Sequence, residues 1–373
     1  MTMMSDLSED LVEEILSRNP ARSLKRLRST CKQWNTLFND HRFTKKHCDK
    51  AAKEFLVVML KTYKVYSVCV KLSGIHNNVD PVMEFKGELG LLGHDYYTTF
   101  HCNGLLLCTT RANPMEYGAR LVVYNPCMGQ TKWIEVRTAY KASDKFALGY
   151  KKNCNSYKIL RFPGSCHNPV LGKFEMYEFN SDSWRVLDDV IHDWDLAAQG
   201  RGVSYKGNTY WVASDKEELV DDFLLEFDFT KERFRRLRLP FKGHCQFNTV
   251  VPSTVREEKL VVLFQSEYEE TVEIWITSKI DEHNDDVSWR KFFTVKCNYT
   301  FSFSMSFMVD EENKVAVCCN TYMRKDGNKT NVYIIGEDMV RKVELLEESA
   351  YLPISYDGEP FLFNYVPSLV PIL

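Results

Sequence analysis

The stretch Phe174–Leu187, FEMYEFNSDSWRVL, decides the fold because its pattern returns at a regular interval along the chain. It combines a strand pattern, a short polar turn and an aromatic residue that opens a second strand. The same order occurs in LVVYNPCMGQTKWIEV at 121–136 and in LLEFDFTKERFRRL at 224–237. The aromatic residues that follow these turns lie 51 and 50 residues apart and are Trp133, Trp184 and Phe234.

Weaker copies extend the repeat in both directions. VEIWITSKIDEHNDDVSWRKFFTV, at 272–295, carries Trp289 a further 55 residues on, with the extra length in the charged loop DEHNDD. Phe85 lies 48 residues before Trp133, and Val340 lies 51 residues after Trp289. The pattern therefore predicts six units.

A β-propeller explains a repeat of this length. A period near ~50 residues is typical of kelch-type blades, since one four-stranded blade cannot bury both faces and stacking blades around an axis does so. Short strand patterns run from Phe55 onward and no long helical pattern interrupts them, which argues against a parallel sheet. The Gly-Gly doublet of kelch blades is absent. We expect a kelch-like propeller of about six degenerate blades, with a barrel or sandwich as the alternative.

The first 46 residues predict a small helical domain instead. Ser8 can cap a first helix, and Pro20 ends it. The apolar residues at helical spacing in this helix are Leu7, Leu11, Val12, Ile15 and Leu16. A second predicted helix carries one apolar stripe and has basic residues on its opposite side. A short third helix is expected to end near Phe43. The stripe consists of Leu24, Leu27, Cys31, Trp34 and Leu37.

The helical and strand patterns divide the chain into a helical domain at 1–46, a linker at 47–54 and a β domain at 55–373. The charge is divided as well: residues 1–53 hold 11 Lys and Arg against 7 Asp and Glu, whereas the rest holds 37 against 44. So small a helical unit usually needs a metal, disulfides or a partner for stability. No metal pattern is present in it, so we expect a partner surface.

Composition excludes several classes of protein. A net charge of -3 argues against a chain that coats nucleic acid. The acidic start MTMMSDLSEDLVEEIL is unlike a secretory signal, and the apolar run FLVVML is far shorter than the ~18 residues of a membrane span. The 12 cysteines follow no regular framework, as in a protein with reduced thiols. We expect a soluble protein of the cytoplasm or nucleus.

The sequence carries no recognised catalytic motif: the phosphate loop, the nucleophile elbow and the HExxH zinc motif are all missing. Acidic runs at 215–222 and 281–286 lack the ligand order of a calcium loop. Four His-Cys neighbours raise the question of a metal or thiol site, but adjacent strand residues point to opposite faces. They are His47-Cys48, His101-Cys102, Cys166-His167 and His244-Cys245. We predict no catalytic residue, no metal and no cofactor.

With these residues in view, DLSEDLVEEILSRNPARSLKRLRSTCKQWNTLFNDHRF at 6–43 resembles an F-box. The F-box pattern runs through Asp-Leu, Ile-Leu, a spaced Leu, and Cys-Lys-x-Trp with a Phe beyond. The remaining chain, including YKILRF, GVSYKGNTYW, EIWITSKI and YVPSLV, is similar to the plant F-box-associated domain of the F-box/kelch type. Together the two resemblances cover nearly the whole chain.

The resemblance implies that the F-box docks on the Skp-type adaptor of a cullin-RING (SCF-type) ubiquitin ligase, while the β domain binds a protein substrate that the sequence does not identify. The implied adaptor-facing residues are Leu7, Ser8, Leu11, Ile15, Leu16, Pro20 and Leu24. The residues implied to hold the F-box together are Leu27, Cys31, Trp34, Leu37 and Phe43.

Two positions depart from the F-box pattern. Ser8 stands where the family usually has Pro, a mild change because Ser also caps helices. Asn19 stands where Leu or Val is usual, and a buried amide without a partner would cost about 1–3 kcal/mol.

Two other functions stay open at this point. The basic second helix could bind nucleic acid, although it lacks a base-reading pattern of Asn, Gln and Arg on one face. A propeller could also be an enzyme with its active site at the central channel, but the sequence offers no convergent carboxylates or metal ligands. A non-catalytic substrate receptor is the favoured hypothesis, without membrane or nucleic-acid partners.

Overall fold

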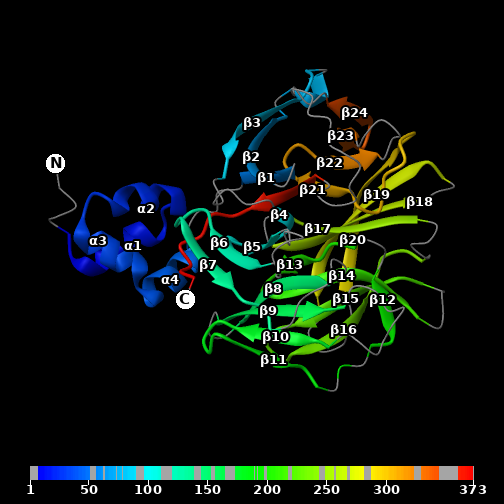
Figure 1. Cartoon of the computed structure of the whole chain (residues 1–373). Helices are drawn as coiled ribbons and strands as arrows, with labels where there is room; N and C mark the ends of the chain where they lie inside the picture. The colour runs from blue at the N-terminus through cyan, green and yellow to red at the C-terminus, as the bar shows by residue number, and fades with distance from the viewer. Residues whose placement is uncertain are drawn as a thin grey trace.

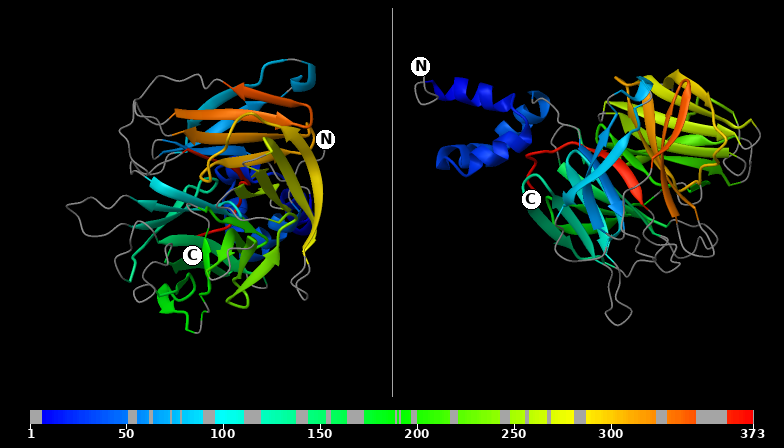
Figure 2. Two further views of the ribbon diagram at one scale, coloured as in Figure 1. Left: turned by 90° about the vertical axis from the view of Figure 1, so that its right-hand side faces the viewer. Right: turned by 90° about the horizontal axis from the view of Figure 1, so that it is seen from above.

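The computed structural model has four helices followed by six small sheets (Figure 1). It describes residues 7–372 except for 51–55, 62–63, 73, 78, 90–95, 111–119, 138–143, 153–155, 164–172, 189, 191, 197–199, 217–220, 243–247, 256–257, 267–268, 281–286, 323–328 and 344–359. The helices are α1 (Glu9–Ser17), α2 (Ala21–Arg28), α3 (Lys32–Asn39) and α4 (His41–Lys50). They lie to one side of the sheets in Figure 1 and in the right view of Figure 2, and the C-terminal segment lies between the two parts.

The six sheets are the blades of a propeller, which confirms the predicted fold class. Blade 1 consists of β25 (Phe361–Tyr365), β1 (Leu56–Lys61), β2 (Lys64–Lys71) and β3 (Val82–Glu88), with a short 3-10 turn at Ile75–Asn77. Blade 2 consists of β4 (Tyr96–Cys102), β5 (Leu105–Thr110), β6 (Leu121–Asn125) and β7 (Gln130–Ile134). Blade 3 consists of β8 (Lys145–Lys151), β9 (Ser156–Phe162), β10 (Glu175–Glu178) and β11 (Ser183–Val186).

The other three blades follow in chain order. Blade 4 consists of β12 (Trp194–Leu196) and β13 (Val203–Tyr205), which both pair with β14 (Asn208–Asp215), and of β15 (Phe223–Asp228) and β16 (Arg233–Arg238). Blade 5 consists of β17 (Asn248–Val255), β18 (Lys259–Ser266), β19 (Thr271–Ile280) and β20 (Val287–Lys296). Blade 6 consists of β21 (Ser306–Asp310), β22 (Val315–Tyr322), β23 (Lys329–Gly336) and β24 (Met339–Val343). The strands nearest the axis are β25, β4, β8, β13, β17 and β21, and they contact one another across the blade boundaries.

The repeated residues all lie on the outer, fourth strand of a blade, from the aromatic Phe85 on β3 to the aliphatic Val340 on β24. Two of the repeated tryptophans show why the repeat interval is close to the length of one blade. The Nε1 of Trp184 donates to the carbonyl of Glu135 in the preceding blade (2.8 Å), and the Nε1 of Trp289 donates to that of Arg238 (3.0 Å). The repeat is therefore a contact between neighbouring blades.

The helical domain differs in two respects from its prediction. The stripe expected on a single second helix is divided between α2 and α3, because the chain turns at residues 29–31. Ser29 and Thr30 donate their hydroxyls back to the carbonyls of Arg26 (3.0 Å) and Leu27 (2.6 Å), and Cys31 is extended. Such side-chain hydrogen bonds compete with helix continuation. In addition, α4 continues to Lys50, so residues 47–50 of the expected linker are helical.

Blade 1 closes the propeller by joining the two ends of the β domain. Its inner strand β25 (red in Figure 1) pairs antiparallel with β1, in a register that sets Val58 opposite Phe363. Leu362 on β25 is 1% exposed and packs with Met59 and residues of blade 6. The first and last blades are held together by this strand pair.

We therefore predict that Leu362→Asp destabilises the β domain by at least about 3 kcal/mol, because it removes buried apolar surface and places a carboxylate in the closing blade. Val82→Asp is the matched control, since Val82 lies on the outer strand β3 of the same blade and is 39% exposed. Urea unfolding followed by tryptophan fluorescence measures both. Equal midpoints for the two variants would contradict a closing role for β25.

Candidate functional site

The exposed apolar residues of α1 form the candidate adaptor face. Leu11 and Ile15, four residues apart and thus on one side of the helix, are 53% and 41% exposed. Ser8 is exposed as well, and Leu7 and Pro20 are half-buried. Large apolar side chains exposed at helical spacing indicate a surface that a partner covers.

Charges hold α1 in place without covering this face. Hydrogen bonds from Lys50, then Arg18 and Lys46, lower the pKa of Glu14 to about 2. Lys50 and Lys46 come from α4, and their Nζ atoms lie 2.8 and 3.2 Å from the Glu14 carboxylate. On the other side, Gln33 of α3 donates to Glu9 at 3.1 Å. The apolar face is therefore presented on a helix fixed from two neighbours.

Two of the residues implied to face the adaptor lie in the interior instead. Leu16 is 1% exposed and Leu24 is 0% exposed. Both belong to a cluster with Phe38 and Phe43 that orders the helices. They support the exposed face and do not form it.

The residues implied to hold the F-box together fall into two groups. Phe43 is 1% exposed in the cluster, and three others pack against it while partly buried: Leu27, Trp34 and Leu37. Cys31 is half-buried at the start of α3 and is not a member of the cluster. The sequence pattern as interpreted above omitted Phe38, although it follows Trp34 by four residues and so continues the helical spacing.

The two departures from the F-box pattern have clear structural outcomes. Ser8 occupies the N-cap of α1, where its carbonyl accepts from Val12 (3.0 Å), but its hydroxyl makes no capping hydrogen bond. Asn19 is half-exposed, its amide donates to the carbonyl of Ile15 (2.8 Å), and its own carbonyl contacts His47 Nε2 at 2.8 Å. The expected cost of a buried amide without a partner therefore does not arise within this chain.

The same helical cluster extends into the propeller. It includes Cys127 from the turn between β6 and β7 and Leu369 from the C-terminal segment, which are 5% and 2% exposed. Lys25 donates to the carbonyl of Pro126 (3.3 Å), and Arg28 contacts the sulfur of Met128 (3.7 Å). The F-box and blade 2 thus share one apolar interior.

Asn125 fixes the C-terminal segment at the contact between the F-box and blade 2, which we call the joint. Its side chain is 0% exposed, and its Nδ2 donates to the carbonyls of Ser368 (3.0 Å) and Val370 (2.7 Å). Its Oδ1 accepts from the backbone of Met128 (3.0 Å). One buried amide therefore holds the turn and the C-terminal segment together, and Figure 2 (right) shows that segment between the helices and the blades.

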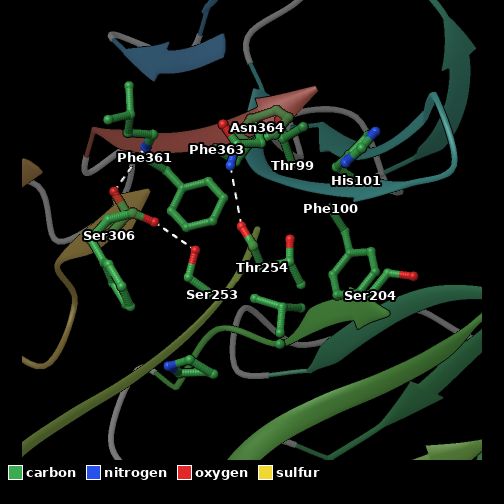
Figure 3. A pocket seen from close by; sticks show the side chains of 15 residues that line it. Thr99, Phe100, His101, Ser204, Ser253, Thr254, Ser306, Phe361, Phe363 and Asn364 are labelled. Carbon is green, nitrogen blue, oxygen red and sulfur yellow. Dashed lines mark hydrogen bonds between the residues drawn. The ribbon is translucent and has the colours of Figure 1, made fainter. Parts of the chain in front are cut away.

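The second candidate site is a hollow in the channel where the inner strands meet. It is lined by residues of β4, β13, β17, β21 and β25, and its empty volume is about 480 Å³, the part open to solvent included. Figure 3 shows the ring of Phe361 pointing into it between Ser306 and Thr254. The polar side chains that line it are Thr99, His101, Ser204, Ser253, Thr254, Ser306 and Asn364.

His101 lies at one side of this hollow, with its ring against Phe363 and Tyr365 at centroid distances of 5.8 and 5.3 Å. Its Nε2 is 3.1 Å from the backbone N–H of Gly104, from which it accepts. Burial lowers the pKa of His101 to about 3. The imidazole ring is therefore neutral at pH 7. Its packing and its hydrogen bond indicate a structural role and not acid-base chemistry.

The His-Cys neighbours form no metal centre where they can be followed. The Nε2 atom of His47 contacts the carbonyl of Asn19. The side chain at 48 and the pairs at 166–167 and 244–245 lie outside the described residues. Among the residues that the structure describes, no three His, Cys, Asp or Glu side chains gather as metal ligands would. None of the described helices combines the length and the apolar character needed to cross a membrane.

A small helical module with an exposed apolar face is packed on a six-bladed propeller with a polar channel, and this combination defines the structural class of the chain. The comparisons give the family. The F-box domain matches residues 4–46, and the F-box associated beta propeller domain matches residues 56–372. The chain belongs to the F-box proteins that carry this propeller.

Relatives cover the whole chain. A putative F-box/kelch-repeat protein of Arabidopsis thaliana is 45% identical over 396 residues, covering 99% of this chain and 98% of its own length. A putative F-box protein of the same plant is 47% identical, with 99% and 98% covered. Another putative F-box/kelch-repeat protein of that plant is 48% identical, with 99% and 97% covered.

The joint predicts that Asn125→Ala loosens the F-box from the propeller. Each buried group left unpaired costs about 1–3 kcal/mol, so the C-terminal segment should be released. Limited proteolysis should then cut this segment several times faster, and small-angle scattering should show a larger radius. Asn180→Ala, at an exposed turn residue of blade 3, is the control. Unchanged proteolysis and radius in the Asn125 variant would contradict the proposed role.

His101 predicts a pH dependence of stability. Its folded pKa of about 3 lies below the unfolded value of about 6.5, so only the unfolded chain binds a proton between these values. Stability is complete above about pH 6.5 and falls by up to about 1.4 kcal/mol per pH unit below it. In urea unfolding between pH 7.5 and 5, His101→Phe should give a shallower fall than the unsubstituted chain. Identical slopes would contradict this prediction.

Proposed function

We propose that this protein is the substrate-recognition subunit of an SCF-type ubiquitin ligase, with the F-box docked on a Skp-type adaptor and the propeller bound to a target protein. The observation that carries the proposal is the exposed pair Leu11 and Ile15 on a helix that its neighbours fix. The F-box match supports the identity of the partner, since F-boxes in general bind such adaptors.

In this proposal the protein is not itself an enzyme. Ubiquitin transfer belongs to other subunits, and this chain brings the target to them. The absence of catalytic motifs in the sequence is compatible with that role. We place this action in the cytoplasm or nucleus, where cullin-RING ligases act.

The basic side of α2 gives less support to nucleic-acid binding. Lys25 bonds the carbonyl of Pro126, and Arg28 donates to Asn35 (2.5 Å) and Asn39 (2.8 Å), so both take part in contacts within the chain. Arg22 and Arg26 are exposed, but two arginines make a weak electrostatic surface. The receptor function has the stronger observation behind it.

Co-purification with a Skp-type adaptor tests the proposal. We expect a stable complex with the full chain and at least a 100-fold loss of affinity in the Leu11→Asp/Ile15→Asp variant, because burying each apolar side chain contributes about 1.5–3 kcal/mol. Val79→Asp is the matched control, since Val79 lies in the propeller and is 51% exposed. Failure of the unsubstituted chain to bind the adaptor, or full binding by the double variant, would refute the proposal.

A further inference from the structure

The channel hollow is lined by uncharged groups. Among the described residues that line it, none is Asp, Glu, Lys or Arg, and His101 is neutral because burial lowers its pKa to about 3. The guanidinium of Arg201 contacts the ring of Phe361, but Arg201 does not line the hollow and has a further interaction within the chain. A charged ligand group would therefore lose its water without finding an opposite charge on the described lining.

Three inner strands form one wall of the hollow and are bonded to one another in pairs. The hydroxyl of Ser253 on β17 donates to the backbone of β21 (2.6 Å). The backbone N–H of Leu362 on β25 donates to the Oγ of Ser306 on β21 (2.8 Å). The Nδ2 of Asn364, also on β25, donates to the carbonyl of Thr254 on β17 (3.2 Å). The polar groups of this wall are thus positioned before any ligand arrives, which lowers the entropy cost of binding.

These bonds leave part of the hydrogen-bonding capacity of the wall unused. Ser306 is 2% exposed and its Oγ accepts from the backbone, but its O–H donates to no described residue. The Oδ1 of Asn364 and the hydroxyl of Thr254 likewise bond to no described residue. Figure 3 shows these three residues around the ring of Phe361. The wall therefore offers a donor at Ser306, an acceptor at Asn364 and a hydroxyl at Thr254 that acts as either.

This set of groups distinguishes between charged and neutral ligands. A carboxylate only accepts hydrogen bonds and would leave the Oδ1 of Asn364 without a donor. An ammonium group only donates and would leave the O–H of Ser306 without an acceptor. A carboxamide carries both a carbonyl oxygen and N–H groups, so it satisfies both residues.

The spacing of the wall favours a carboxamide over a hydroxyl. Ser306 is bonded at Leu362, and Asn364 lies two residues further along β25, a rise of about 6.6 Å. One hydroxyl oxygen that bonds to both sides spans on the order of 5.5 Å, whereas the oxygen and nitrogen of a carboxamide are separate atoms and reach further. The empty volume of about 480 Å³ includes the part open to solvent, so the enclosed part admits a side chain and not a folded segment.

We propose that the hollow binds the carboxamide side chain of a glutamine or asparagine of the target protein. The proposal rests on the receptor function and adds the chemistry of its recognition. The carboxamide oxygen accepts from Ser306, its N–H donates to the Oδ1 of Asn364, and Thr254 supplies a further hydrogen bond. The methylene groups of the bound side chain pack on the ring of Phe361. Acidic and basic side chains are rejected because each leaves one wall group unpaired.

Fluorescence polarisation on the full chain, alone and with its adaptor, tests this site. The probes are labelled glycine-serine peptides that differ only in a central Gln, Asn, Glu, Asp, Lys or Ala. The Gln or the Asn peptide should bind at least about fivefold more tightly than its isosteric acid and than the Lys and Ala peptides. An acidic or Lys peptide that binds as tightly as the amide peptides would overturn the proposal. So would equal binding of the Ala peptide, or no measurable binding of either amide peptide.

Thr254→Val locates the binding. It keeps the shape of the side chain and removes a hydroxyl that bonds to no described residue, so the propeller should melt at an unchanged temperature. The amide peptide should bind about fivefold more weakly because one hydrogen bond is lost. Thr294→Val is the matched control, since Thr294 is exposed on the outer strand β20. Equal peptide affinity in the two variants would overturn the proposal.

Asn364→Asp tests the specificity. A carboxylate at this position pairs with an ammonium group, so the Lys peptide should rise to at least the affinity of the amide peptides. Asn180→Asp adds the same charge at an exposed turn of blade 3 and should leave the preference for amides unchanged. Thermal melting checks that both variants are folded. If Asn364→Asp weakens all peptides alike, Asn364 has only a structural role and the proposal is overturned.

The adaptor complex is measured in the same preparations, so the two proposals fail separately. An intact adaptor complex that shows no preference for amide peptides overturns the hollow as a carboxamide site and leaves the receptor function in place. A chain that selects amide peptides through Thr254 and Asn364 but binds no adaptor overturns the receptor function alone.

Discussion

The pairing of β25 with β1 is the interaction on which the rest of the structure depends. It brings together residues about three hundred positions apart in the chain and completes blade 1. Without it the inner strand of this blade would be missing, and the apolar side chains of β1 and blade 6 would face water. It also places Phe361 and Asn364 in the channel. Closure of the propeller and construction of its channel are therefore one event.

The same strand leads the chain to the F-box. Beyond Tyr365 the chain crosses blade 2 at Gly104, whose φ is +78° and where a Cβ would lie 2.3 Å from the Cβ of Ser368. Only glycine fits so close an approach with that backbone conformation. Leu369 then enters the helical cluster. Because of this path, a defect in the closing blade also disturbs the base on which the adaptor face is mounted.

The repeat of aromatic residues was sufficient to predict six blades because it reports contacts between neighbouring outer strands, such as Trp289 with Arg238. The helical pattern likewise predicted the interior of the F-box, but it could not show that Leu16 and Leu24 turn inward, since spacing identifies a stripe and not what covers it. The joint at Asn125 brings together residues that are distant in sequence. No local pattern contains such information.

A fixed joint has a physical consequence for the receptor function that we propose. The F-box and blade 2 share buried side chains, and Asn125 bonds the segment between them, so the face at Leu11 and the channel at Phe361 keep a constant separation. When a flexible connection is replaced by a rigid one, the effective concentration of one bound partner near the other depends on geometry and not on chain entropy. In the proposed receptor, the direction in which a bound target would be presented is then set by the packing of Leu369 and Cys127 between the F-box and the propeller.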